Sequence, residues 1–188
     1  MSFRDVALLA EPRSLRWRSV DGDSLEHLVL QRTATGIRAE SVMVDASGAG
    51  TRGIAYAVDC TPDFTVTGFS LSTTDGQRPA LARRDGRWRR RDGELPGFDE
   101  CADIDMSGTP FTNTLPIRRE SWQPGQSRTI TTLYIPFDDF APRIDRQIYT
   151  CLSPRLFRYQ SADGSFEAEI SVDDDGLVFD YPSLFARI

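Results

Sequence analysis

Apolar and polar residues alternate along most of this chain. Between residues 52 and 60, for example, Ile54, Tyr56, Val58 and Cys60 occupy every second position. Successive side chains of a β-strand point to opposite faces, so this spacing predicts strands with one buried face. The pattern predicts strands over residues 14–20, 25–32, 37–45, 52–60, 64–73, 79–84, 86–91, 101–106, 128–136, 144–151, 155–160, 165–172 and 177–181.

Turn signals separate many of these stretches. Asp-Gly readily supplies the positive backbone φ angles of tight hairpin turns. Neighbouring strands should therefore pair antiparallel, as a meander. The six Asp-Gly pairs are Asp21-Gly22, Asp75-Gly76, Asp85-Gly86, Asp92-Gly93, Asp163-Gly164 and Asp175-Gly176.

The region 93–126 is the least regular part of the chain. It has no convincing helical stripe, and Pro110, Pro116 and Pro124 interrupt it, so long loops are expected there. No repeat or linker divides the chain, which predicts one domain over residues 1–188. A sheet of about a dozen strands must twist and cover its edges. We therefore predict a mainly β fold: a single antiparallel, meandering sheet curled into a roll or open barrel, with few short helices.

Composition narrows the function. The net charge is −6, which argues against nucleic acid as a partner. Cys60, Cys101 and Cys151 are far apart and odd in number, so neither a disulfide framework nor a zinc site is expected. No signal peptide and no transmembrane segment is recognisable. A cytoplasmic location is expected, with no metal and no cofactor, and no oligomeric state is predicted.

Residues 22–25 spell Gly-Asp-Ser-Leu, the signature of a hydrolase family whose serine is the nucleophile. Such a serine needs a histidine base. The only histidine here is His27, and residues three apart on a strand point to opposite faces. We interpret the motif as a turn followed by a strand. The run Asp173–Gly176 is likewise interpreted as a hairpin turn rather than a calcium loop.

Asp103 and Asp105 share one face of a predicted strand, with Cα atoms roughly 6.5–7 Å apart. Carboxylates at such spacings can serve as acid and base in glycoside hydrolysis. Ordinary pairing with arginine, or a solvated face, is the other and more common explanation. A hydrolase that acts on a glycosyl or acyl bond through Asp103 and Asp105 is therefore the alternative function.

All 22 basic residues are arginines, and several lie between residues 83 and 91 around Trp88. Trp88 and Arg90 face the same side of a predicted strand. Together they could stack on a sugar and bind its hydroxyl groups or an anionic headgroup. A solvated hairpin with Trp88 capping the core is the other interpretation.

Three blocks of sequence, 103–119, 147–150 and 172–185, resemble the bacterial putative glycolipid-binding family. The run Pro-Phe-Thr-Asn-Thr-Leu-Pro-Ile-Arg-Arg at 110–119 is the most distinctive. The resemblance implies a spiral β-roll, similar in shape to bacterial carriers of lipoproteins and lipids. It also implies a noncatalytic binding or carrier protein for a glycolipid or similar amphipathic ligand, held inside the rolled sheet.

With this resemblance, the candidate ligand-binding residues are Trp88, Arg90, Asp103, Asp105, Asn113, Arg118, Arg119, Tyr149 and Tyr181.

The segment 103–119 is also expected to pack against the sheet with some polar groups buried. Leu115 and Ile117 should anchor it, and Asn113 can bond backbone groups in a turn. Arg118 or Arg119 should reach one of the two aspartates or the ligand.

Overall fold

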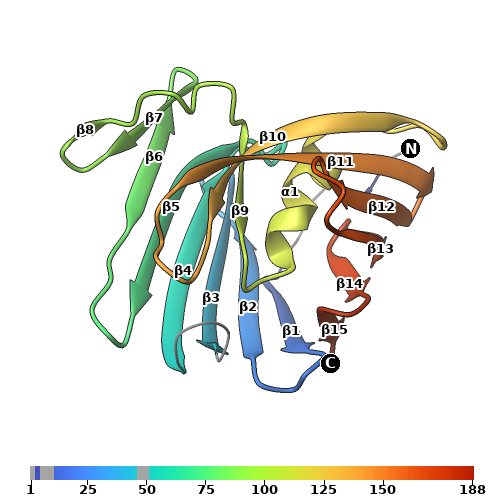
Figure 1. Ribbon diagram of the computed structural model, residues 1–188, viewed down its shortest axis with the longest axis horizontal. Coiled ribbons are helices and arrows are strands. Elements are labelled where there is room, and N and C mark those ends of the chain that lie inside the picture. Colours follow the sequence, from blue (N-terminus) through green and yellow to red (C-terminus); the bar gives the residue numbers. More distant parts are fainter. Residues whose placement is uncertain (1–2, 5–10, 46–50) are drawn as a thin grey trace.

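The computed structural model describes residues 3–4, 11–45 and 51–188. One sheet of fifteen strands dominates it (Figure 1). The strands are β1 (Arg13–Ser19), β2 (Leu25–Arg32), β3 (Ile37–Asp45), β4 (Arg52–Cys60), β5 (Val66–Thr73), β6 (Ala80–Arg84), β7 (Arg87–Arg90), β8 (Gly93–Glu94), β9 (Asp103–Met106), β10 (Ser127–Ile135), β11 (Arg143–Ser153), β12 (Leu156–Ser161), β13 (Glu167–Val172), β14 (Val178–Tyr181) and β15 (Phe185–Arg187).

Each predicted strand is present, with its ends within two residues of the prediction. Only the short strands β8 and β15 were not foreseen. The strand order runs from β8 back to β1, then from β15 back to β9, so sequence neighbours are also sheet neighbours except for β8 and β9, which form the two edges. The meander prediction is confirmed, with one exception: β9 pairs with β10 in parallel, whereas the other pairs are antiparallel.

The Asp-Gly turns behave as predicted. The six glycines of these pairs all have positive φ angles, from 74° to 152°. At Asp85-Gly86 both residues do, with φ of 52° and 78°. That combination defines the two-residue turn that suits the twist of a hairpin, here between β6 and β7.

The region 93–126 does contain loops, but the expectation is wrong for residues Phe111–Arg119, which form helix α1. All residues from Phe111 to Ile117 are buried. A helix buried on every side shows no apolar stripe, which is why periodicity missed it. Pro116 within the helix lacks the N–H group that a regular helix uses, which further obscured the signal.

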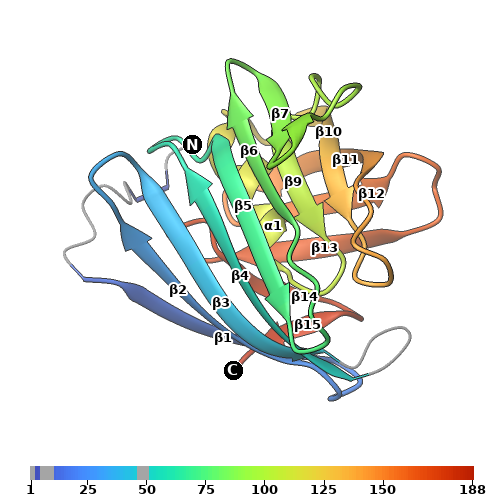
Figure 2. The same ribbon diagram turned by 90° about the vertical axis from the view of Figure 1, so that its left-hand side faces the viewer.

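Helix α1 lies inside the curled sheet, between the strands of the N-terminal half and those of the C-terminal half (Figures 1 and 2). Its side chains contribute to two hydrophobic cores. Phe111 and Leu115 belong to the core formed with β1–β6, and Ile117 belongs to the core formed with β11–β14. The helix therefore fills the centre of the roll that the sequence predicted.

Strand β9 is covered on both faces. Ile104 and Met106 pack into the N-terminal core, whereas Asp103 and Asp105 point the other way, toward α1. This double burial places two carboxylates between a strand and a helix. No helix of the described residues is long and apolar enough to cross a membrane.

Candidate functional site

The C-terminal end of α1 is closed by an ion pair. Arg119 donates two hydrogen bonds to Asp103, from Nε to Oδ1 at 3.1 Å and from Nη2 to Oδ2 at 2.7 Å. Asp103 is fully buried, and Arg119 also contacts Glu120. The expectation that an arginine of this segment reaches one of the two aspartates is confirmed. Since both Asp103 oxygens are engaged, we do not carry forward a catalytic pair of Asp103 with Asp105.

Among the described residues, the groups that donate hydrogen bonds to Asp105 carry no charge. Its Oδ1 accepts hydrogen bonds from Thr112 Oγ1 at 2.6 Å and from the Met106 N–H at 2.8 Å. Its Oδ2 accepts one from Gln147 Nε2 at 2.7 Å. Burial raises the pKa of Asp105 above its ordinary value, while these three donors act in the opposite direction. Two carboxylates two residues apart therefore have quite different surroundings.

A polar network continues from Asp105 to the middle of α1. Gln147 lies beside Tyr149 on β11, and the Tyr149 hydroxyl donates to Asn113 Oδ1 at 2.8 Å. Asn113 Nδ2 donates in turn to the carbonyl oxygen of Pro110 at 3.2 Å. Asn113 thus bonds a backbone group, as expected, and the segment 103–119 packs with buried polar groups, which confirms the prediction.

A cleft of about 190 Å³ opens next to this network. We call it the inner cleft, because it lies beside α1 on the inner side of the roll. Asp105, Thr109 and Asn113 supply polar groups to it, from β9 and the start of α1. Aromatic side chains from the strands β10, β12, β14 and β15 and from the β12–β13 turn line much of the rest: Tyr134, Tyr159, Phe166, Tyr181 and Phe185.

The aromatic residues pack as a group. The ring centroids of Tyr159, Phe166 and Tyr181 lie 6.0–6.1 Å from one another, and Phe185 continues the group at 6.4 Å from Tyr181. Such tilted contacts hold the rings in defined orientations. The inner cleft therefore combines a carboxylate, an amide and a rigid aromatic wall.

A second buried carboxylate lies behind the cleft. Glu26 of β2 accepts hydrogen bonds from Ser41 Oγ and the Tyr56 hydroxyl at Oε1, and from Thr109 Oγ1 at Oε2. Burial raises the pKa of Glu26. This residue was not among the predicted candidates, although its sequence position carries a signal. Glu26 shares a strand face with Leu28 and Leu30, and a charged residue on an apolar face is rarely buried without a special partner.

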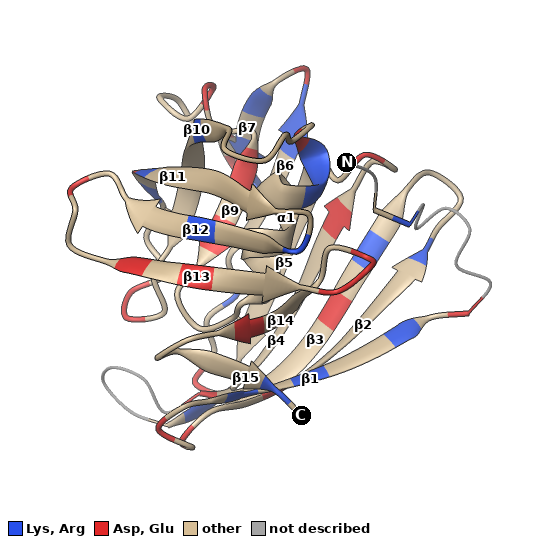
Figure 3. Ribbon diagram, turned by 90° about the vertical axis from the view of Figure 1, so that its right-hand side faces the viewer, with Lys and Arg blue, Asp and Glu red and all other residues tan. Residues whose placement is uncertain are grey.

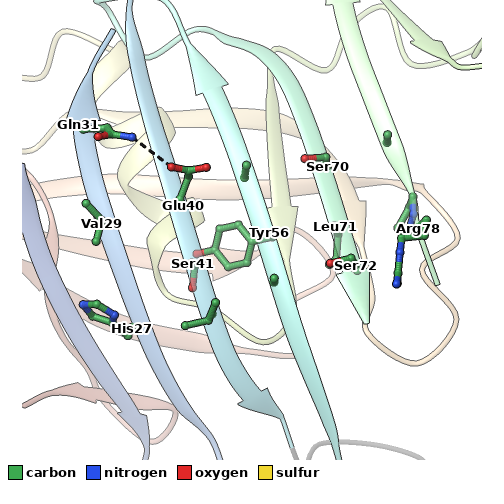
Figure 4. A pocket seen from close by; sticks show the side chains of 15 residues that line it. His27, Val29, Gln31, Glu40, Ser41, Tyr56, Ser70, Leu71, Ser72 and Arg78 are labelled. Carbon is green, nitrogen blue, oxygen red and sulfur yellow. Dashed lines mark hydrogen bonds between the residues drawn. The ribbon is translucent and has the colours of Figure 1, made fainter. Parts of the chain in front are cut away.

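A larger hollow lies on the opposite, outer face of the sheet, over β2–β6 (Figure 4). This outer groove has a volume of about 740 Å³. Small side chains such as Ala55, Ala57 and Ser70 form its floor, with His27 and Arg78 toward its two sides. None of the nine candidate residues lines it.

The nine candidates therefore divide into groups. Asp105, Asn113 and Tyr181 line the inner cleft, and Tyr149 lies directly behind it. The structure thus brings together four of the residues that the sequence singled out. Tyr134, Tyr159 and Phe166 were missed, although the strands that carry or adjoin them were predicted.

The other candidates lie elsewhere. Trp88 is fully buried and its Nε1 donates to the carbonyl oxygen of Cys101 at 2.8 Å, so it caps the core. Arg90 lies in a separate hollow between β6, β7 and residues 135–142. Arg118 packs over the rings of Phe3 and Phe64, at 5.2 and 4.7 Å from their centroids. These positions, like that of Arg119, are outside the inner cleft.

Two sequence motifs have the local roles expected of them. Ser24 is buried whereas His27 is exposed and bonds Ser14, so the Gly-Asp-Ser-Leu motif builds no nucleophile and base pair. Asp173 Oδ1 accepts the N–H groups of Asp175 and Leu177, which closes the expected turn.

Charges on the C-terminal strands are largely balanced within the sheet. Figure 3 shows one basic residue on β12 beside acidic residues on β13. Arg158 of β12 bonds Glu169 of β13 at 3.3 Å. The acidic residues of β9 lie next to the basic C-terminal end of α1, where Arg119 forms an ion pair with Asp103.

A curled, open sheet around a central helix, with a polar and aromatic cleft beside that helix, defines the class of protein. Residues 14–187 match the family described as "putative glycolipid-binding". The chain belongs to this family, which confirms the resemblance seen in its sequence. No curated protein matches it.

Among solved structures, the chain is similar to the crystal structure of a DUF1089 family protein from Pseudomonas aeruginosa. The two are 38% identical, and the TM-score is 0.77. The match covers 92% of this chain and 95% of the Pseudomonas chain. The fold is therefore shared over nearly the whole length of both proteins.

Proposed function

We propose that this chain is a noncatalytic binding or carrier protein for a glycolipid or similar amphipathic ligand, and that the ligand's polar headgroup occupies the inner cleft. The observation that carries this proposal is the meeting of Asp105 and Asn113 with an aromatic wall in one cleft. Carboxylate and amide groups bind sugar hydroxyls, and aromatic faces pack against the apolar face of a sugar ring.

The size of the inner cleft suits a headgroup rather than a whole lipid. Its volume of about 190 Å³ is below the roughly 300–1,000 Å³ typical of sites for drug-sized ligands. The apolar chain would extend from the cleft along its rim, where Leu184 is 37% exposed and Phe185 is half-buried. Each methylene buried there would contribute about 0.8 kcal/mol.

The family name supports an amphipathic ligand in general. The three cysteines are buried and unpaired, which is in keeping with a reducing compartment such as the cytoplasm. We therefore extend the proposal to binding inside the cell.

Native mass spectrometry of the protein purified from cells, followed by lipid extraction, tests the proposal directly. Two matched variants locate the site, since each puts a tryptophan at an exposed position of one hollow. Leu184→Trp obstructs the rim of the inner cleft, and Ala55→Trp fills the outer groove. We expect Leu184→Trp to lose at least about tenfold in bound ligand and Ala55→Trp to keep it.

The reverse result would move the site to the outer groove and overturn the assignment of the inner cleft. Protein that carries no ligand and binds no glycolipid probe would overturn the function itself.

A further inference from the structure

The charge of the inner cleft indicates which headgroups it accepts. The chain has 22 arginines, yet none of the residues that line this cleft is an arginine. Asp105 is the charged residue in the lining. Arg90, Arg118 and Arg119, which were expected to meet the headgroup, lie outside this cleft.

A second carboxylate reinforces the first. Gln147 Nε2 donates to Asp105 Oδ2 at 2.7 Å and to Asp145 Oδ2 at 3.0 Å, so both carboxylates gather around one amide group. Within the described ranges, neither aspartate forms an ion pair with an arginine, whereas Asp103 and Asp173 both do. The negative charge at Asp105 and Asp145 is therefore offset only by neutral donors.

Glu26 adds a third acidic group behind the same cleft. Its partner Thr109 lines the cleft, and the other two groups that bond it are the hydroxyls of Ser41 and Tyr56. An anionic headgroup would meet these acids without an arginine to compensate. A cation would be attracted by each of these groups in its ionised form and would favour that form, since charges interact strongly where water is partly excluded.

The aromatic wall favours the same charge. A cation within about 6 Å of an aromatic ring is attracted by the electrons of its face, and aromatic residues recur in sites for ammonium groups. Tyr159, Phe166 and Tyr181 present such rings next to Asp105. Two independent features of the cleft, its acidic groups and its aromatic rings, thus both favour a positively charged group on the ligand.

We propose that the inner cleft selects headgroups that carry a positively charged amine, such as an amino sugar, over neutral and phosphate-bearing headgroups. This inference rests on the proposed function and specifies its ligand. Asp105 is the residue that contacts the ammonium group, and Asp145 acts on it through Gln147.

Three amphiphiles with the same octyl chain provide the test: octyl glucosaminide, octyl glucoside and octyl phosphate. Each is titrated as a monomer into the full chain by calorimetry at about pH 6, where the amine is protonated. We expect octyl glucosaminide to bind at least about tenfold more tightly than octyl glucoside, and octyl phosphate to bind most weakly.

Asp105→Asn should abolish the preference for the amine while the neutral glucoside still binds. Asp99→Asn is the matched control, because it makes the same charge change at an exposed position outside the cleft. If Asp105→Asn does not fold, Asp145→Asn should still reduce the preference severalfold.

The outcomes separate the two levels of the argument. Equal binding of the glucosaminide and the glucoside, or tightest binding of the phosphate, overturns the amine inference and leaves the binding function intact. If none of the three amphiphiles binds, the proposed function fails with it.

Discussion

The two ends of helix α1 bind their neighbouring aspartates in different ways. At its C-terminal end, Arg119 and Asp103 neutralise each other in a buried, bidentate ion pair. At its N-terminal end, Asp105 is held by Thr112 and Gln147, which carry no charge. The aspartates are two residues apart on one strand. The comparison shows that two aspartates on the same strand can have different surroundings. The charge of the groups that bond each aspartate, rather than its place on the strand, makes the difference.

The largest expected effect on stability is at the C-terminal end of α1. Arg119→Ala leaves the Asp103 carboxylate buried without its partner, which should lower the free energy of unfolding by about 3–5 kcal/mol. Arg119→Lys should recover only part of this, because lysine lacks the planar fork that binds both oxygens. Urea unfolding measures both variants. A loss below about 1 kcal/mol would mean that the pair acts like a surface pair.

At the N-terminal end of α1, substitution of Asp105 should change ligand binding rather than stability. Asp105→Asn keeps the size of the side chain and removes a charge that burial disfavours, so the free energy of unfolding should change by no more than about 1 kcal/mol. Binding of octyl glucosaminide should fall at least about tenfold. Thermal melts and calorimetry on the same preparation check the two expectations. A large loss of stability would show that Asp105 is as structural as Asp103.

The pH dependence of stability should distinguish Asp105 from its variant. Burial raises the pKa of Asp105 in the folded chain. A raised pKa means that its contribution to stability is fully present below the unfolded-state pKa and is lost as the pH rises through the folded-state pKa. The stability of the wild type relative to Asp105→Asn should therefore decrease as the pH rises from about 3.9 upward. Unfolding at a series of pH values tests this, and a relative stability that increases would contradict it.

The smallest effect is expected far from both ends of α1. Arg89 and Glu94 form an exposed ion pair at 3.2 Å on the β7–β8 hairpin. Arg89→Ala should change the free energy of unfolding by no more than about 0.5 kcal/mol and leave ligand binding unchanged. Loss of ligand binding in this variant would instead point to the arginine-rich hairpin as a second contact surface.

Local signals were sufficient for most of the sheet. Alternation at Ile54, Tyr56 and Val58 predicts β4 because one face of that strand is buried throughout and carries the apolar residues, and Asp-Gly pairs mark the turns. Helix α1 was not predicted, because a helix that is buried on all sides shows no apolar stripe. Strand β15 was not predicted, because three residues are too few to show alternation.

The candidate site could be predicted only in part, for a similar reason. Asp105, Asn113 and Tyr181 stand in distinctive blocks of sequence, so a resemblance could single them out. Tyr159 and Phe166 come from the β12–β13 hairpin, and nothing local says which strand the curled sheet will bring to face β9. That information belongs to the tertiary arrangement, in which α1 separates the two halves of the roll.

The pairing of β1 with β15 has a consequence for how the chain folds. These strands meet in the middle of the sheet, whereas β8 and β9, which are neighbours in sequence, form its two edges. Hairpins such as β3–β4 can form locally within about 1–10 μs. The contact between β1 and β15 joins opposite ends of the described chain and must wait for the slow closure of a very long loop. We therefore expect the central seam of the sheet to be the last part to form.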